Sequence, residues 1–164
     1  MASDFNEKEF KECLSHYSTG IVIVTTKYED NLYGLTVNSF TSVSLKPPLI
    51  LFCIDKSASS LDAFLKSDSF AISILSSSQH EIAQKFANSN NEKWKSVKYV
   101  FGATGSPIIL PNLSFMECEK FATYEAGDHY IIIGKVITLE VEKSEKKNPL
   151  IYFRGMYHHS PEAI

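Results

Sequence analysis

Residues 55–60 form a polar segment that directly follows an apolar run typical of a buried strand. The segment contains three serines, one alanine and one lysine. Backbone amides at the start of a helix carry partial positive charge and point outward, so a phosphate can accept hydrogen bonds from them. The hydroxyls of Ser57, Ser59 and Ser60 can donate to the same phosphate. The segment therefore predicts a phosphate-binding loop. The alternative is that Ser57 or Ser59 only caps the helix that follows.

A second segment, residues 34–44, is rich in small polar side chains for a strand. A planar heteroaromatic ring with alternating N–H and C=O groups needs closely spaced hydrogen-bond partners. Thr36, Asn38, Ser39 and Ser42 can supply them. The segment is a candidate ring-binding strand, and an edge strand with a polar outer face explains the same residues equally well.

A third candidate is the turn Gly127-Asp128-His129, which joins two long predicted strands. Because histidine titrates near neutral pH, His129 can contact a nicotinamide or hold a proton. Simple turn chemistry with an exposed histidine is the alternative. Near the carboxyl end, Arg154 and Tyr157 can clamp a negatively charged cofactor, and a surface ion pair is the alternative for Arg154.

Composition narrows the class of protein. The 164 residues suffice for one domain, residues 1–164, and the net charge of −3 is scattered, which argues against nucleic acid as a partner. No apolar run approaches the roughly 20 residues needed to span a membrane. The amino terminus lacks the apolar core of a secretion signal. We therefore expect a soluble cytoplasmic protein that binds neither nucleic acid nor membrane.

Several kinds of chemical site are absent from the sequence. Cys13, Cys53 and Cys118 are widely separated and form no CxxC or Cys/His zinc spacing. His158 and His159 have no carboxylate at metal-ligand spacing, so they are predicted to lie in a solvated tail. There is no GxGxxG after a strand, GxxxxGK[ST], HExxH or GxSxG. No metal site is expected.

The elements that must position these segments are mainly strands. Apolar and β-branched runs bounded by turn residues predict strands over residues 21–26, 33–40, 49–54, 70–75, 113–124, 130–142 and 150–153. The first two can form a hairpin. The run 49–54 is continuously apolar, as expected of a strand covered on both faces.

Short helices are predicted between the strands. Phe10, Leu14 and Tyr17 recur at helical spacing after Asn6 and Glu9, which have the spacing of a capping box. Further helices are expected over residues 61–65 and 78–87, the second with a capping box of Ser78 and Glu81. Residues 88–112 are predicted to be a long covering loop. Without strict βαβ alternation, the fold class expected is mainly β: a closed antiparallel barrel with small peripheral helices.

Taken together, these segments resemble the flavin reductase-like, FMN-binding split-barrel family, which includes the small reductase components of two-component flavin monooxygenases. The resemblance lies in residues 17–26, residues 34–44 with Pro47-Pro48-Leu49, Gly127-Asp128-His129 and residues 149–157. The four segments occur in family order over nearly the whole chain. The resemblance implies a split β-barrel, an antiparallel Greek-key barrel that binds FMN or FAD and uses NADH or NADPH as co-substrate.

The resemblance also implies roles for individual residues. The ring and ribityl groups would be surrounded by Thr36, Val37, Asn38, Ser39, Phe40, Ser42 and Val43, and the phosphate by Lys56, Ser57, Ala58, Ser59 and Ser60. Lys85 and Phe86 match a helix-end pair that also touches the flavin. His129 corresponds to a histidine beside the nicotinamide, and Arg154 to Tyr157 to the segment that closes the pocket. Family members often have more basic residues in the phosphate segment, so FMN and FAD both stay open.

The implied reaction is transfer of a hydride from nicotinamide C4 to flavin N5 once the rings stack at about 3–3.5 Å. His129 would then act by positioning. The family further implies a homodimer and delivery of reduced flavin to a partner monooxygenase. A flavin-binding barrel without reductase activity is the first alternative, and a ligand-free structural barrel the second. Gly127-Asp128-His129 favours the reductase.

Overall fold

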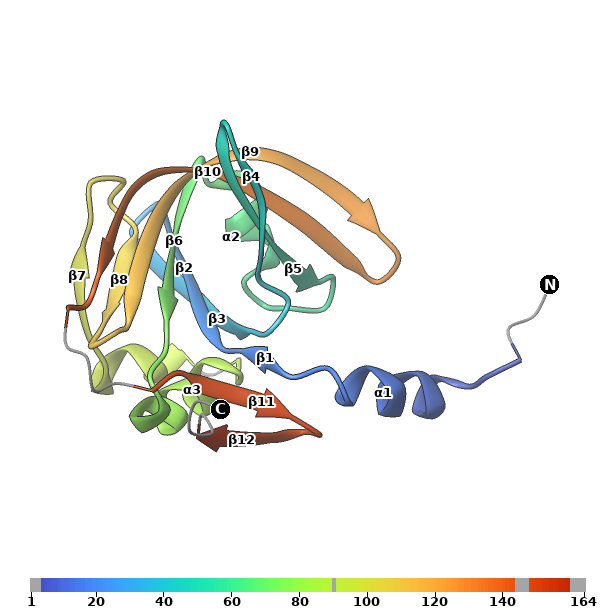
Figure 1. Ribbon diagram of the computed structural model, residues 1–164. Helices are drawn as coiled ribbons and strands as arrows, with labels where there is room; N and C mark the ends of the chain where they lie inside the picture. Colours follow the sequence, from blue (N-terminus) through green and yellow to red (C-terminus); the bar gives the residue numbers. More distant parts are fainter. Residues whose placement is uncertain (1–3, 90, 144–147, 160–164) are drawn as a thin grey trace.

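The computed structural model describes residues 4–89, 91–143 and 148–159. Its centre is a seven-stranded sheet in the order β3-β2-β6-β9-β10-β5-β4, with every neighbouring pair antiparallel. The sheet curls around on itself (Figure 1). The strands are β2 (Val22–Tyr28), β3 (Asn31–Val37), β4 (Thr41–Leu45), β5 (Pro48–Asp55), β6 (Ser69–Ile74), β9 (Ser114–Ala126) and β10 (His129–Val141). The predicted antiparallel barrel and the β2–β3 hairpin are confirmed.

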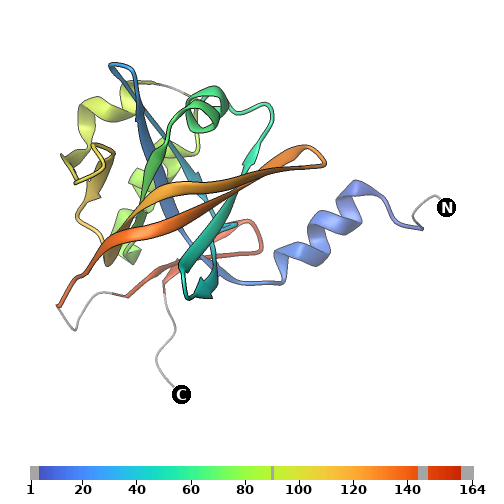
Figure 2. The same cartoon turned by 90° about the horizontal axis from the view of Figure 1, so that it is seen from above.

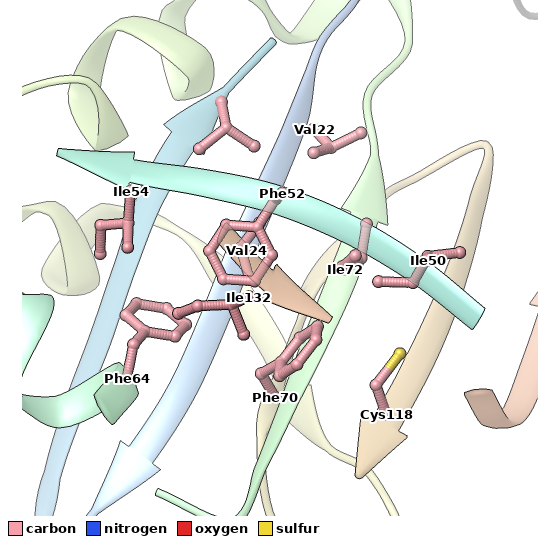
Figure 3. Close-up of a cluster of buried hydrophobic side chains, with 11 residues drawn as sticks. Val22, Val24, Ile50, Phe52, Ile54, Phe64, Phe70, Ile72, Cys118 and Ile132 are labelled. Carbon is pink, nitrogen blue, oxygen red and sulfur yellow. The ribbon is translucent and has the colours of Figure 1, made fainter. Parts of the chain in front are cut away.

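The inside of the barrel is filled by aromatic and branched side chains (Figure 3). Phe52 on β5 packs edge-on against Phe64 of the short helix α2 (Leu61–Lys66), with ring centroids 5.6 Å apart, and against Phe70 of β6 at 5.2 Å. Such tilted pairs add to the free energy gained from burying the rings. The core thus joins α2 to strands from both halves of the sheet.

A second apolar cluster lies on the outside of β2. Residues 22–26 of β2 are all buried, because Val22 and Val24 face the barrel interior while Ile23 packs against α3 (His80–Phe86) and its neighbours. Residues 49–54 were predicted to be a strand buried on both faces, and that prediction is wrong. In β5 buried and half-exposed residues alternate, so only one of its faces is in the core.

Residues 88–112 are not the long loop that was predicted. They form the short helix η2 (Asn91–Ser96) and a hairpin of β7 (Lys98–Phe101) and β8 (Pro107–Leu110). The hairpin turn is held by Glu117 of β9, whose buried carboxylate accepts hydrogen bonds from the backbone N–H groups of Ala103 at 3.0 Å and Thr104 at 2.8 Å. This contact between distant segments is what a local pattern cannot show.

Two short strands from opposite ends of the sequence pair beside the barrel. Strand β1 (Thr19–Gly20) pairs with β11 (Leu150–Phe153), which pairs with β12 (Met156–His159). His158 and His159 therefore belong to a strand, which corrects the solvated tail that was predicted. Helix α1 (Glu7–Ser15) has the predicted Asn6–Glu9 capping box, leads away from the barrel in both views (Figures 1 and 2), and has no buried residue.

The helix α3 begins differently from the prediction. The predicted capping box of Ser78 and Glu81 is absent, and α3 has no side-chain cap. A capping box of Ser76 and Gln79 begins instead the short helix η1 (Ser77–Gln79), which directly precedes α3. Gln79 is buried, so it makes this contact inside the molecule. None of the described helices is long and apolar enough to cross a membrane.

One side chain ties together strands from opposite ends of the sheet order. Ser39 lies in the link from β3 to β4, and its hydroxyl accepts a hydrogen bond from the Cys53 N–H at 2.9 Å and donates one to the Cys53 carbonyl at 3.2 Å. It continues the β4–β5 ladder, whose last pair is Thr41 with Leu51. The end of β3 is thereby held next to the end of β5.

Replacing Ser39 by alanine should lower the free energy of unfolding by about 1–3 kcal/mol, because two half-buried backbone groups of Cys53 lose their partner. Urea unfolding of the variant measures the change. The control is Ser44→Ala, since the Ser44 hydroxyl only contacts the backbone N–H of Lys46 in the exposed turn. A Ser39 variant as stable as this control would contradict the bridging role.

Candidate functional site

Two adjoining hollows lie where β3, the 55–60 loop and α3 meet. The first, of about 200 Å³, contains residues of both hydroxyl-rich segments, which the sequence could not show to be neighbours. The second, of about 300 Å³, shares Thr36 and Ala87 with it. The first is lined by Gly34, Leu35, Thr36, Ser57, Ala58, Ser59, Ser60, Phe86, Ala87, Asn88, Ser89 and Lys93, and the second by Ile21, Thr36, Val37, Asn38, Ala87, Tyr152 and Tyr157.

The 55–60 loop has a fixed shape with free donors. The carboxylate of Asp55 accepts hydrogen bonds from the backbone N–H and the hydroxyl of Ser57, both at 2.6 Å, and these bonds hold the pKa of Asp55 below its usual value. Within the described residues, the backbone N–H groups and hydroxyls of Ser59 and Ser60 have no hydrogen-bond partner. Two adjacent amides and two hydroxyls are thus available to a ligand.

The capping alternative for this loop is wrong. The residue at the N-cap of α2 is Ser60, and its side chain makes no capping hydrogen bond. Ser57 is engaged with Asp55 instead, and Ser59 is exposed. The serines therefore serve something other than helix initiation.

Strand β3 forms the wall shared by the two hollows. It is an edge strand, as one interpretation of the sequence had it, so one side of its backbone is unpaired by the sheet. Thr36 lines both hollows, and its hydroxyl donates to the Ala83 carbonyl of α3 at 2.7 Å. Val37 points into the barrel core, and Asn38 is exposed. This edge is open to a ring that needs backbone partners.

Aromatic residues border both hollows. Phe86 is buried at the end of α3, and Gly34 of β3 makes room for it, since a Cβ on Gly34 would lie 2.8 Å from the ring. In the second hollow, Tyr152 and Tyr157 lie with ring centroids 5.5 Å apart. Burial raises the pKa of Tyr157 above its usual value, and the hydroxyl can donate a hydrogen bond.

Four predicted ring contacts lie outside the two hollows. The Ser39 hydroxyl is occupied by Cys53, and Phe40 packs against the barrel core. Ser42 and Val43 are exposed on β4, the other edge of the sheet. Within the part of the chain that the structure describes, neither of these two lines a hollow together with Thr36.

Three predicted basic contacts are directed elsewhere. Lys56 forms an ion pair with Glu125 of β9, which raises the pKa of the lysine. Lys85 donates to the Ser96 hydroxyl at 3.1 Å. Arg154 occupies the β11–β12 turn, where its guanidinium lies 5.3 Å from the Phe153 ring centre.

His129 lies at the border of the loop and outside both hollows. It begins β10 opposite Asp55, and its Nδ1 is 2.7 Å from the Asp128 carboxylate, whose pKa it lowers. The Asp128 carbonyl also accepts a hydrogen bond from the Lys56 N–H at 2.9 Å. The Gly127-Asp128-His129 turn is thus fixed directly to the start of the 55–60 loop.

Sequence analysis missed several residues that line the hollows. Asn88, Ser89 and Lys93 lie in the stretch that was predicted to be a covering loop, Ala87 ended the predicted helix over 78–87, and Tyr152 lies on β11. Among them, Lys93 is buried and makes two hydrogen bonds. The only available signal was that long loops often line sites.

The family comparison matches most of the chain. The model of the flavin reductase like domain matches residues 14–161. The chain belongs to this family. Its fold is accordingly the split barrel of the flavin reductases, as the sequence resemblance implied.

Individual flavin reductases resemble the chain over most of its length. The reductase subunit HsaB of a flavin-dependent monooxygenase from Mycobacterium tuberculosis is 31% identical over 157 residues, covering 96% of this chain and 84% of HsaB. The FMN reductase (NADH) SmoA of Agrobacterium fabrum is 37% identical, covering 80% and 75%. The crystal structure of nitrilotriacetate monooxygenase component B from Mycobacterium thermoresistibile superposes with a TM-score of 0.91 at 32% identity, covering 94% of this chain and 87% of that one.

The residues around the two hollows fit a flavin nucleotide. The free amides and hydroxyls of Ser59 and Ser60 suit a phosphate, which accepts several hydrogen bonds at once. The unpaired edge of β3 suits a ring with alternating donors and acceptors, and Tyr157 supplies an apolar wall with a polar tip. The two kinds of surface adjoin at Thr36.

Replacing Ser59 and Ser60 together by alanine should weaken FMN binding roughly 10- to 30-fold, because two hydrogen bonds to a charged phosphate are lost. Titration of FMN fluorescence measures the affinity. The matched control is Ser57→Ala, which should have a smaller effect because the Ser57 hydroxyl already donates to Asp55. An equal or larger loss in the Ser57 variant would contradict this assignment of the loop.

Proposed function

We infer that this chain is an NAD(P)H-dependent flavin reductase, a single domain that reduces FMN or FAD and supplies the reduced flavin to a partner monooxygenase. The observation that supports it most is the meeting of the two hydroxyl-rich segments around one hollow, in a chain that belongs to the flavin reductase family. Similar proteins are named as an FMN reductase (NADH) and as reductase parts of monooxygenases, which is the basis for the co-substrate and the partner.

The catalytic contribution of the protein is mainly positioning. When bound, the flavin supplies the acceptor for a hydride from the nicotinamide. Ser59 and Ser60 hold the phosphate, and the edge of β3 around Thr36 holds the ring. Tyr157 and Tyr152 keep water from one side of the ring. Because hydride transfer needs aligned rings more than proton transfer, the absence of a carboxylate or histidine from the lining of the two hollows agrees with this role.

Mixing the purified protein with NADH and either FMN or FAD tests the function. A loss of the absorbance of reduced nicotinamide is expected when flavin is present, and no loss is expected without flavin. Flavin binding without NADH oxidation would instead indicate a flavin-binding barrel. If the protein neither binds flavin nor oxidises NADH, the remaining interpretation is a ligand-free structural barrel.

We propose that His129 positions the nicotinamide nucleotide. Its place beside the 55–60 loop supports this role, and its side chain is about two-fifths exposed, so a second ligand can reach it. His129→Ala should raise the KM for NADH roughly 2- to 10-fold, as expected for one lost hydrogen bond, with little change in FMN affinity. Steady-state kinetics with His80→Ala as the exposed control measures it. An unchanged KM would reject this role.

We also propose that the reductase is a homodimer. Apolar side chains are exposed on the α1 face, on β4 and on the outer half of β9: Phe10 and Leu14, Val43 and Leu45, and Phe121 and Tyr124. Leu45 is 89% exposed. A second copy of the chain would cover them and would reach Ser42 and Val43.

Sedimentation equilibrium should give twice the chain mass of 18.4 kDa. Leu45→Glu should lower the measured mass toward that of one chain, whereas Leu139→Glu on the far half of β10 should leave it unchanged.

A further inference from the structure

Lys93 is the one lysine that is buried among the described residues. It belongs to η2 and is 8% exposed. Its ammonium donates to the Gly34 carbonyl at 2.8 Å and to the Asn88 carbonyl at 3.2 Å, and it lies 5.3 Å from the centre of the Phe86 ring. An ammonium has three N–H donors, so these two bonds leave one donor free.

Among the described residues, the charge of Lys93 has no counter-ion. In residues 4–89, 91–143 and 148–159, no carboxylate forms an ion pair with it. Lysines that do form ion pairs, such as Lys56 and Lys95, have far more exposed side chains. Burial lowers the pKa of Lys93, which reflects the free energy lost when the ammonium leaves water. A buried cation of this kind is normally paired.

The position of Lys93 indicates what the missing partner is. Lys93 lines the first hollow together with Ser59 and Ser60, whose amides and hydroxyls are also free. A phosphate site needs neutral hydrogen-bond donors together with a cation. The first hollow has both, in the free amides and hydroxyls of the two serines and in the Lys93 ammonium. Asp55 belongs to the same loop but does not line the hollow, where Lys93 is the one charged side chain among the described residues of the lining.

We propose that Lys93 is the cationic ligand of the flavin phosphate and makes the site select phosphorylated flavin over riboflavin. This proposal rests on the proposed function. The 55–60 loop has one lysine, Lys56, and that lysine is paired with Glu125. The proposal explains how such a loop can still bind a phosphate. The positive charge comes from η2, more than thirty residues further along the chain, and not from the loop itself.

The test compares FMN, FAD and riboflavin, which lacks the phosphate, as ligands of the wild type, Lys93→Met and Lys93→Gln. Loss of a charge-assisted hydrogen bond should weaken FMN binding roughly 10- to 100-fold, with riboflavin affinity unchanged within about twofold. FAD should weaken in parallel if its diphosphate occupies the same hollow. Lys93→Arg keeps the charge and should retain part of the selectivity.

Lys95→Met is the matched control, because Lys95 lies on the same helix, is exposed and pairs with Glu92 at 2.6 Å. It should leave all three affinities unchanged. An equal loss of FMN and riboflavin affinity in Lys93→Gln would show a structural role and overturn the proposal, as would an unchanged FMN affinity. Failure of the reductase function itself would be seen separately, as a wild type that binds flavin and oxidises no NADH.

Discussion

The closure of the barrel at Ser39 is the contact on which the candidate site depends. Strands β3 and β5 stand first and sixth in the sheet order, so the sheet alone does not place their ends together. The Ser39 hydroxyl joins the link after β3 to Cys53 near the end of β5. Thr36 precedes that junction and the 55–60 loop follows it, so both segments emerge at one place. The two hydroxyl-rich stretches share a hollow because the barrel closes there.

The outer layer completes the site from the other side. Because both faces of β2 are buried, α3 can pack against the outside of the barrel while the interior stays filled. Phe86 at the end of α3 reaches Gly34, and the chain then turns so that Lys93 bonds to the Gly34 carbonyl. A single position on β3 thus contacts two residues from the segment that covers it. The packing of the outer layer therefore also fixes the position of the Lys93 ammonium.

Local sequence patterns predicted the parts of this structure that local interactions form. The capping box at Asn6 and the β2–β3 hairpin depend on neighbouring residues, and both are present. The β7–β8 hairpin was missed because its turn is held by Glu117, a residue outside the segment. The doubly buried strand was assigned to 49–54 instead of β2, since apolar runs do not reveal which face a barrel encloses.

The same distinction applies to the site. The serines of the 55–60 loop could be recognised from their types and spacing, and they line the first hollow. Lys93 could not be recognised, because its surroundings in sequence are polar and its importance comes from burial against β3. The family resemblance implied that Ser42 and Val43 contact the flavin ring, and in the structure both are exposed on an edge strand of the sheet. Neither residue lines the first or the second hollow.

The bond from Asp55 to Ser57 gives the loop its shape before any ligand arrives. A loop ordered in this way loses little conformational freedom when a nucleotide docks. Entry and departure then depend on the contacts themselves. For a flavin reductase, the cost of ordering this loop is therefore met by the fold and not by each flavin that binds.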